Sequence, residues 1–355
     1  MTEKRKTTPP VQRGRRLPLA GVVLFMTALL VAVIVISTGS GFVHIPFPDV
    51  VRVIAAQLTG LEGLVARLDP LAPVVVIDVR LPRILTAALV GTGLAISGAV
   101  FQGILLNPLA DPYTLGVSAG AAFGASIALL VDFTLLGSWS VPALAFCGAL
   151  ATLMAVIYLT ASSGDFSSGA LILSGIIVAA ILSAGVSFIK YLADEQVGII
   201  IFWLMGSFAS KTWAEVGLTA TAVIPGLIVF LFFSRDLNLL ALGSRTAGSL
   251  GVAPRRISLI LLVAASLISA VCVAVSGIIG FVGLLVPHMV RFVTGPDNRR
   301  LLPVSALVGA ILLLAADTVT RAVLPQEVPI GIITALIGGP VFCYIYRKRQ
   351  TREAR

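Results

Sequence analysis

The chain has 355 residues, of which 58% are hydrophobic and 12% are charged. Ordinary soluble domains carry about 25% charged residues, so this composition, with a mean hydropathy of +1.05, indicates an integral membrane protein with no room for a separate soluble domain. The formal net charge is +9. No polar segment has the basic stripe with interleaved aromatic residues that nucleic-acid binding needs, so that class of function is excluded.

Apolar runs of membrane-spanning length recur from one end of the chain to the other. A helix needs about 20 apolar residues to cross the hydrocarbon core, and we predict an all-α protein with about ten transmembrane helices. The run from Ile257 to Val290 has no Asp, Glu, Lys or Arg and is too long for one span, so we divide it at Gly277 and Gly280. The predicted spans are 17–38, 84–106, 113–131, 141–161, 169–189, 214–233, 257–275, 277–293, 303–320 and 328–346.

The first span has a basic leader, which a cleaved signal peptide would also have. Its apolar stretch is long for that role and no clear cleavage site follows, so an uncleaved helix is favoured. Arg15 and Arg16 are also typical of a twin-arginine signal, but nothing downstream resembles an exported folded domain.

The placement of basic residues predicts the orientation. Most of the 25 Lys and Arg residues lie before residue 17, in 234–256, in 291–300 and after residue 346. By the positive-inside rule, these segments and both termini are cytoplasmic. The predicted organisation is a basic tail (1–16), one transmembrane domain (17–346) with an outer loop at 39–83, and a basic tail (347–355).

Motifs for catalysis and metal binding are missing from the sequence. Cys147, Cys272 and Cys343 lie inside predicted spans without CxxC spacing, so we interpret them as packing residues. Only two histidines occur, which excludes a histidine-based metal cluster. There is no P-loop, so an ATP-driven process would need its ATPase on another polypeptide.

Two connections carry recognisable patterns. The turn NPLADP follows a span, and its key residues are Asn107, Pro108, Asp111 and Pro112. It precedes glycines at 116, 120 and 124, whose spacing predicts a close helix contact. The segment Gln196–Phe208 is apolar but too short to cross a membrane, so we predict a half-inserted or interfacial helix.

Several motifs, in order, resemble the FecCD-type permeases, the membrane subunits of ABC importers for iron-siderophores, haem and cobalamin. The resemblance covers about 42–347. The motifs are RLPR (80–83), NPLADPYTLGVSAGA (107–121), FWLMGSF (202–208), LGVAPRR (250–256), GFVGLLVPHMVR (280–291), LLLAADTVTR (312–321) and EVPIGIITALIGGPVF (327–342).

The resemblance implies a bundle like that of the cobalamin-importer permease, in the bacterial or archaeal cytoplasmic membrane. It implies a homodimer with the path at the dimer interface, two cytoplasmic ATPase subunits that bind ATP, and an external substrate-binding protein. No cofactor is expected in this chain. Docking of the binding protein is expected at Arg80, Arg83 and Arg321, which our topology also places outside; arginines that merely reach the lipid headgroups are the alternative.

The resemblance also assigns roles on the cytoplasmic side. The connection 239–256 would fit a groove on the ATPase through Gly243, Ala247, Leu250 and Gly251; a plain solvated loop is the alternative. Ser167 and Ser168 would lie where the path narrows. His288 is interpreted as a structural group, with haem ligation as the alternative.

We therefore expect a non-catalytic permease subunit that imports an iron complex, with a ferric siderophore ranked before haem and cobalamin. The alternative is a secondary carrier that works without an ATPase, which the lack of charged residues at span centres disfavours.

Overall fold

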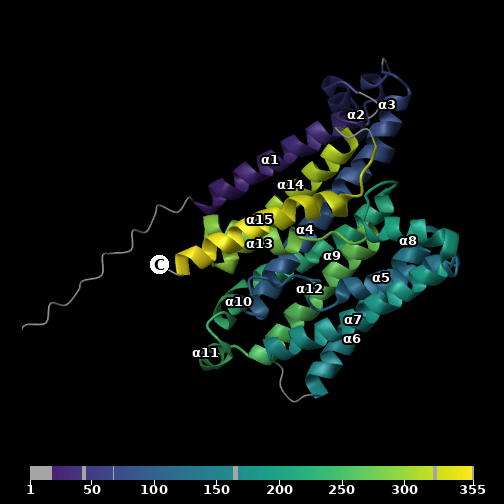
Figure 1. Cartoon of the computed structure of the whole chain (residues 1–355). Helices are drawn as coiled ribbons and strands as arrows, with labels where there is room; N and C mark the ends of the chain where they lie inside the picture. The colour runs from purple at the N-terminus through teal and green to yellow at the C-terminus, as the bar shows by residue number, and fades with distance from the viewer. Residues whose placement is uncertain (1–17, 42–44, 67, 163–166, 323–325, 354–355) are drawn as a thin grey trace, which may run out of the picture.

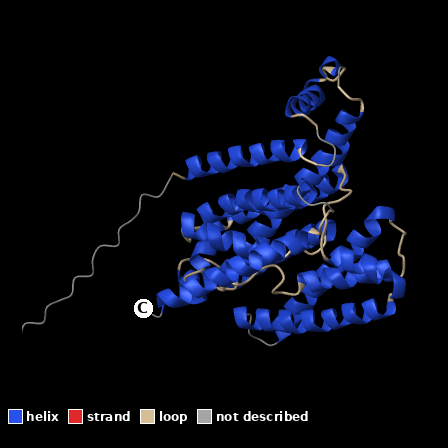
Figure 2. Cartoon of the chain, turned by 45° about the horizontal axis from the view of Figure 1, so that its top comes forward, coloured by secondary structure: helices blue, strands red, loops and turns tan. Residues whose placement is uncertain are grey.

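The structure is a computed structural model that describes residues 18–41, 45–66, 68–162, 167–322 and 326–353. Within these ranges all regular structure is helical and no strand occurs (Figure 2). The expected basic tail at 1–16 lies outside the described residues, and the segment expected as a second tail continues the last helix as far as Glu353.

All ten predicted spans coincide with helices. In the described part of the chain seven helices are long and apolar enough to cross a membrane, and three further apolar helices are shorter. The long ones are α1 (Leu19–Gly39), α4 (Leu81–Ile104), α6 (Ser140–Ser162), α7 (Ser168–Leu192), α9 (Trp213–Phe232), α12 (Pro254–Ser276) and α14 (Asn298–Ala322). The shorter ones are α5 (Val117–Leu130), α13 (Val282–Thr294) and α15 (Ile330–Glu353), which is apolar as far as Tyr344.

Helix ends follow local sequence signals. Ser167 caps α7 by accepting a hydrogen bond from Ala170 N, and Thr212 and Glu215 form a capping box at the start of α9. Gly277 ends α12 with φ +73°, a conformation that favours glycine. The division of the long apolar run at Gly277 and Gly280 is therefore confirmed.

The connections contain more helix than the sequence indicated. The expected outer loop at 39–83 is mostly helical, with α2 (Phe47–Thr59), α3 (Leu71–Val74) and a π-helical turn (Val75–Arg80) that leads directly into α4. Buried Ile45, Val50, Val53, Ala72 and Val76 give this part its own small core, which packs its short helices against one another. It forms a lobe at one end of the bundle, beside the end of α1 (Figure 1).

Three short helices complete the connections. α8 (Val197–Leu204) is the short apolar helix predicted within Gln196–Phe208. α10 (Ser234–Leu240) and α11 (Ser244–Ser249) occupy the connection before α12. They lie at the end of the bundle opposite the α2–α3 lobe (Figure 1).

α4 is the central helix, packed against α9, α12, α13 and α14. It approaches two of these neighbours closely because glycines face one another. A Cβ at Gly98 would overlap the carbonyl of Gly283 in α13, and a Cβ at Gly91 would overlap that of Gly309 in α14. Small residues are needed for such backbone contacts in a membrane, where lipid competes for larger side chains.

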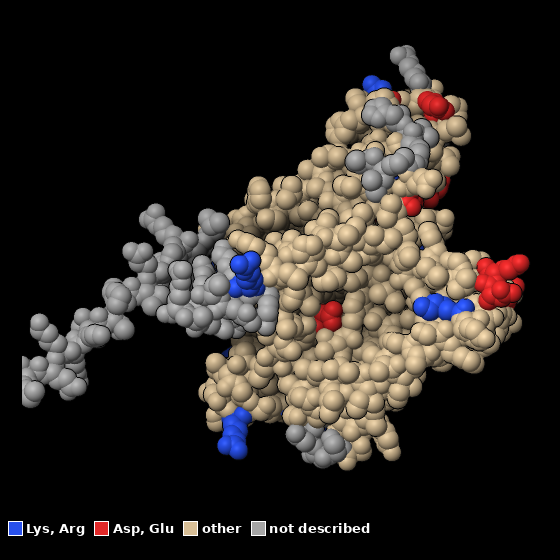
Figure 3. All heavy atoms as spheres, viewed as in Figure 1, with Lys and Arg blue, Asp and Glu red and all other residues tan. Residues whose placement is uncertain are grey.

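The spacing of glycines around α5 predicted its packing in part. A Cβ at Gly120 or Gly124 would overlap backbone carbonyls of α6, so the close contact is confirmed. Gly116, however, lies before the helix with φ +74°. The predicted span began at residue 113, but the turn continues to Gly116 and α5 is correspondingly short. The face seen in Figure 3 is uncharged over most of its area.

Candidate functional site

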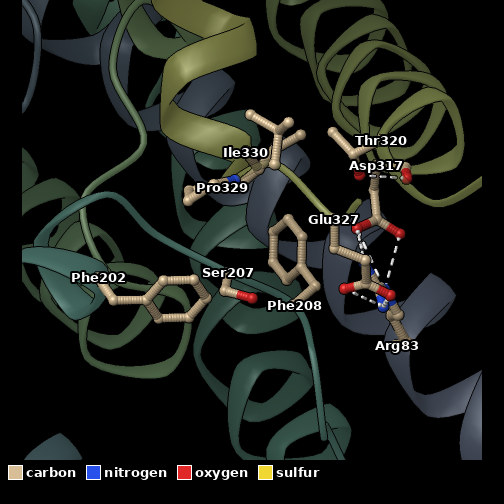
Figure 4. Close-up of a pocket in the computed structure, with 10 residues that line it drawn as sticks. Arg83, Phe202, Ser207, Phe208, Asp317, Thr320, Glu327, Pro329 and Ile330 are labelled. Atoms are coloured by element: carbon tan, nitrogen blue, oxygen red, sulfur yellow. Dashed lines mark hydrogen bonds and ion pairs between the residues drawn. The ribbon is translucent and has the colours of Figure 1, made fainter. Parts of the chain in front are cut away.

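Three charged side chains from distant parts of the chain meet where α4 begins and α14 ends (Figure 4). The guanidinium of Arg83 donates to both carboxylate oxygens of Asp317, with Nη2 2.9 Å from Oδ1 and Nε 3.1 Å from Oδ2. Its Nη1 donates to Glu327, 2.9 Å from Oε1 and 3.2 Å from Oε2. One arginine of α4 thus joins α14 to the segment Gln326–Pro329, which leads into α15.

The two carboxylates differ in exposure. The side chain of Asp317 is 1% exposed, that of Arg83 is 12% exposed and that of Glu327 is 39% exposed. Asp317 also lies 3.7 Å from Nε of Arg321. A buried charge is tolerated only with a partner, so Asp317 depends on the two arginines, whereas Glu327 can exchange Arg83 for water.

Arg80 and Arg321 hold the end of α1. Arg321 donates from Nη1 to the carbonyl of Ser40 at 2.8 Å and from Nη2 to that of Ser37 at 2.6 Å. Arg80 donates from Nη1 to the carbonyl of Thr38 at 2.6 Å. The last carbonyls of a helix lack intrahelical partners and carry a partial negative charge, so both guanidinium groups stabilise this terminus.

The three arginines predicted for docking therefore come together at one end of the bundle. Arg80 and Arg321 are only 5% and 6% exposed, because both side chains point into the protein toward α1. Arg83 faces outward more, but carboxylates of this chain bind it. A role in docking stays a prediction for all three, and the structure adds a structural role for two of them.

A small cavity adjoins Arg83. Its lining includes Phe202, Ser207 and Phe208, which follow one another around the end of α8, and Pro329 at the start of α15 (Figure 4). Its volume is about 10 Å³, enough for about one water molecule. The cavity can hydrate the ion pairs but is too small for a metal chelate.

A nearby lysine belongs to the same electrostatic environment. Lys211 lies in the connection between α8 and α9. Burial lowers the pKa of its ammonium group, the carboxylate of Glu215 acts in the opposite direction, and the positive charge of Arg83 lowers the pKa further. The ammonium group of Lys211 is thus close enough to Arg83 for the two positive charges to interact.

Three segments cross by their backbones next to this cluster; we call this place the crossing. It consists of Met205–Ser207 after α8, Ser276–Phe281 from the last residue of α12 to the residue before α13, and Ile330–Gly331 at the start of α15. Ser207 N donates to Ser276 O at 2.8 Å, Ile330 N to Gly206 O at 3.1 Å and Gly331 N to Met205 O at 3.0 Å. These bonds satisfy backbone groups where helices are interrupted within the bundle, as a bilayer requires.

A tyrosine stabilises the interrupted segment from the other side. The hydroxyl of Tyr113 donates to the carbonyl of Ile279 and accepts from its N–H at 3.2 Å. A single side chain thus satisfies both backbone groups of a residue that neither α12 nor α13 includes.

An apolar groove of about 590 Å³ lies on the open side of the crossing. α8 and α15 form its sides, and its floor comes from the segment between α12 and α13. The residues that line it include Leu204, Met205, Ile278, Phe281 and Leu336. It has the size of a small-molecule site, but it is open and offers few polar groups.

The predicted turn between the second and third spans is built as its residue types suggest. Asn107 Oδ1 accepts from Leu109 N at 2.9 Å. Asp111 Oδ1 accepts from Tyr113 N and Thr114 N, at 3.1 and 3.0 Å. Pro112 packs against Gly283, and Pro108 lies between the two side-chain-stabilised halves. The turn therefore places Tyr113 for its contact with Ile279.

Ser167 and Ser168, the expected cytoplasmic gate, lie at the start of α7. Ser168 donates to the carbonyl of Ile104 at 3.3 Å, which ties this start to the end of α4. The two serines occupy a junction between helices, and their role in narrowing a path stays a prediction.

The residues expected to contact an ATPase surround α11. Gly243, with φ +95°, and Gly251, with φ +87°, flank it and allow the chain to turn sharply on both sides. Ala247 is buried, whereas Leu250 is 55% exposed. Asn238 of α10 donates to Asp297 at 2.7 Å and accepts from Asn298 N at 2.8 Å, which fixes this region to the start of α14.

Candidate metal ligands are scattered. Among the described residues no group of three or more His, Cys, Asp or Glu side chains could hold a metal ion. Cys272 is buried and packs against Gly93, as a packing residue would. The ring of His288 contacts Phe292 and Phe342 edge to face, which agrees with a structural role.

Sequence reasoning missed Asp317 and Glu327 as the partners of the arginines. A signal for Asp317 was present, because an acid inside an apolar span needs a cationic partner. Glu327 is the first residue of the motif EVPIGIITALIGGPVF, but nothing in that pattern connected it with Arg83.

The sequence model of the FecCD transport family matches residues 29–348. The Uncharacterized ABC transporter permease protein YvrB of Bacillus subtilis (strain 168) is 42% identical over 332 residues, which are 92% of this chain and 93% of that protein. The Cobalamin import system permease protein BtuC of Halobacterium salinarum is 45% identical over 282 residues, 79% and 75% of the two chains. A solved metal-chelate type ABC transporter in an inward-facing conformation has a TM-score of 0.81 and 36% identity, covering 93% of this chain and 99% of that chain.

Proposed function

The chain belongs to the FecCD transport family, and we propose that it is the membrane subunit of an ATP-driven importer of an iron complex. It is a multi-pass ABC transporter permease of the prokaryotic inner membrane. The observation that carries the proposal is the TM-score of 0.81 over nearly the full length of a metal-chelate type ABC transporter chain.

In this proposal two copies of the chain form a homodimer with the path between them. The open groove beside the crossing supports this arrangement, because it is apolar, about 590 Å³ in volume and open along one side. A second copy would close it into one half of a central path. The helices that line the groove are interrupted at the crossing, and these interruptions are points at which the wall of the path could bend.

ATP hydrolysis would take place on two cytoplasmic partner subunits, since the sequence has no P-loop. The segment 239–256 would fit against them through α11. The hydrogen bonds of Asn238 with Asp297 and Asn298 support the transmission of movement from the ATPase subunits into the membrane domain, because they connect this segment to α14. α14 is a single helix that reaches Asp317 and Arg321 at the opposite end.

Both termini and α11 would then be cytoplasmic, and the α2–α3 lobe and the arginine cluster external. An external substrate-binding protein would dock on that side. The guanidinium groups of Arg80, Arg83 and Arg321 are gathered at this end of the bundle, and such a local group of cations favours carboxylates of a partner.

The substrate is proposed to be a ferric siderophore, followed by haem and cobalamin. The relative from Halobacterium salinarum is named for cobalamin import, which supports a bulky metal chelate as the class. Selection among the three would rest largely with the binding protein.

Copurification and transport separate this proposal from a secondary carrier. The tagged chain, solubilised from its own membrane, is expected to bring down a P-loop ATPase that mass spectrometry identifies. In proteoliposomes, uptake of a ⁵⁵Fe-labelled siderophore should need ATP and should survive collapse of the proton gradient. Uptake by the chain alone, driven by a proton gradient without ATP, would contradict the proposal.

A further inference from the structure

We propose that Glu327 occupies Arg83 in place of a carboxylate of the external binding protein, and that docking exchanges one carboxylate for the other. This inference rests on the proposed function. It concerns which residue binds Arg83 before the binding protein docks, and it identifies Glu327 as the residue that docking displaces.

The geometry around Arg83 distinguishes a fixed partner from an exchangeable one. Asp317 is part of α14, is 1% exposed and lies between Arg83 and Arg321. Its removal from Arg83 would leave a buried charge. Glu327 binds the outer edge of the same guanidinium through Nη1, at 2.9 and 3.2 Å, and is 39% exposed.

The backbone around Glu327 also permits exchange. Glu327 lies in the connection between α14 and α15, whereas the backbone of Asp317 is fixed within the helix α14. Figure 4 shows the two carboxylates reaching Arg83 from these two elements. A partner carboxylate arriving from outside would replace Glu327 and form the same two charge-assisted hydrogen bonds.

Charge balance favours the exchange when the partner is acidic. Arg80, Arg83 and Arg321 together carry one positive charge more than Asp317 and Glu327. A carboxylate of the binding protein that approaches Arg83 would repel the carboxylate of Glu327, because little water separates like charges in a partly buried site. Release of Glu327 and binding of the partner are therefore linked.

Displacement of Glu327 from Arg83 could move the wall of the groove, because only a short segment of chain connects Glu327 with that wall. Glu327 lies three residues before Ile330, whose N–H donates to Gly206 O, and Gly331 N donates to Met205 O. These two bonds join the start of α15 to the end of α8, and both helices line the groove. Docking would thus loosen the connection that holds the groove wall in its present position.

The test measures the affinity of the assembled importer for its external binding protein, defined as the protein that stimulates its ATP hydrolysis. Glu327→Gln keeps the size of the side chain and removes its charge. We expect it to tighten binding about twofold to fivefold, since a partly exposed ion pair is worth up to about 1 kcal/mol. Biolayer interferometry on nanodisc-embedded complexes would give the affinity at two salt concentrations.

The matched control is Glu195→Gln. Glu195 is an exposed acid just before α8, and the change in net charge is the same, but no hydrogen bond or ion pair connects it to Arg83. A general electrostatic effect would tighten binding equally in both variants, and that outcome would overturn the inference. Unchanged or weaker binding in Glu327→Gln would overturn it as well.

A double-mutant cycle with Arg83→Gln isolates the pair. In that background Glu327→Gln should no longer improve binding, and an improvement that persists would count against the exchange. Size-exclusion chromatography checks that each complex is assembled. If the wild-type importer binds no external protein at all, the proposed function fails; if it binds one but Glu327→Gln has no effect, only the exchange fails.

Discussion

Gly91 of α4 and Gly309 of α14 face each other so closely that a Cβ on either would overlap the backbone carbonyl of the other. A Cβ on Gly98 would likewise overlap the backbone carbonyl of Gly283 in α13. The central helix is therefore positioned by backbone contact with two neighbours. The helices of the bundle are therefore in close contact where the chain crosses the membrane. The contribution of each glycine to stability can be tested by substitution.

Gly98→Ala should destabilise the protein, because the new methyl group has no space and either α4 or α13 must move. Overpacking of this kind costs about 1–3 kcal/mol, so the midpoint of thermal unfolding in detergent should fall. Gly217→Ala is the control, since nothing lies within 4 Å of a Cβ at that position in α9. Equal midpoints for the two variants would show that the contact does not hold the helices.

Tyr113→Phe should lower stability without changing side-chain volume much. The variant leaves the N–H and carbonyl of Ile279 without their hydroxyl partner inside the bundle, and an unsatisfied buried polar group costs about 1–3 kcal/mol. Tyr158→Phe serves as the control, because Tyr158 is 73% exposed on α6. Thermal midpoints that do not differ between the two would contradict the role assigned to Tyr113.

Arg321→Gln should weaken the attachment of α1. The substitution removes the charge that balances Asp317 and the bonds to the carbonyls of Ser37 and Ser40. We expect faster limited proteolysis at the end of α1 and a lower thermal midpoint. Arg52→Gln removes only an exposed ion pair with Asp49 and should leave the proteolysis rate and the thermal midpoint unchanged. If Arg52→Gln changes them as much as Arg321→Gln does, the buried contacts of Arg321 are not the cause of the effect.

The charge bias predicts that the 39–83 region is external and that α11 is cytoplasmic. In a cysteine-free version of the chain, Gly63→Cys should react with a membrane-impermeant maleimide in intact cells and Gly248→Cys should not. Both positions have open space around a Cβ, so accessibility alone does not separate them. Labelling of Gly248→Cys in sealed cells would reverse the orientation.

A bulky side chain on α11 should disturb contact with an ATPase. Gly251 is a poor test position because its φ of +87° would strain any other residue. Gly248→Trp avoids that strain, and we expect less ATPase to copurify or ATP hydrolysis to continue without uptake. Gly63→Trp is the control on the other side of the membrane; normal assembly and uptake in Gly248→Trp would argue against the coupling role of 239–256.

Hydrophobic length and glycine signals were sufficient to predict the ten apolar helices. Even the interruption at Gly277 was found, because a glycine in an uncharged run is a strong local signal. The region 39–83 was harder. Its helices are short and stabilise one another through Val50, Val53 and Val76, and such mutual burial leaves no run of apolar residues long enough to detect.

The arginine cluster was predicted as a set of residues but not as a structure. RLPR and the end of LLLAADTVTR identified Arg80, Arg83 and Arg321 only through resemblance. Their contacts depend on where α1, α4 and α14 end relative to one another. Glu327 belongs to the motif EVPIGIITALIGGPVF, but an acid in a connection between helices gives no indication of which arginine it will bind.

The sequence by itself determined that this protein crosses the membrane repeatedly, approximately where its ten apolar helices lie, and which family it resembles, because hydrophobic length and turn residues act locally. Only the tertiary structure decided that Arg83 binds Asp317 across 234 positions of chain, that two arginines close the end of α1, and that three segments cross beside an apolar groove. Those contacts depend on how distant helices pack, including the close approaches of glycines in α4 to carbonyls of α13 and α14. No local pattern records which glycine will meet which carbonyl.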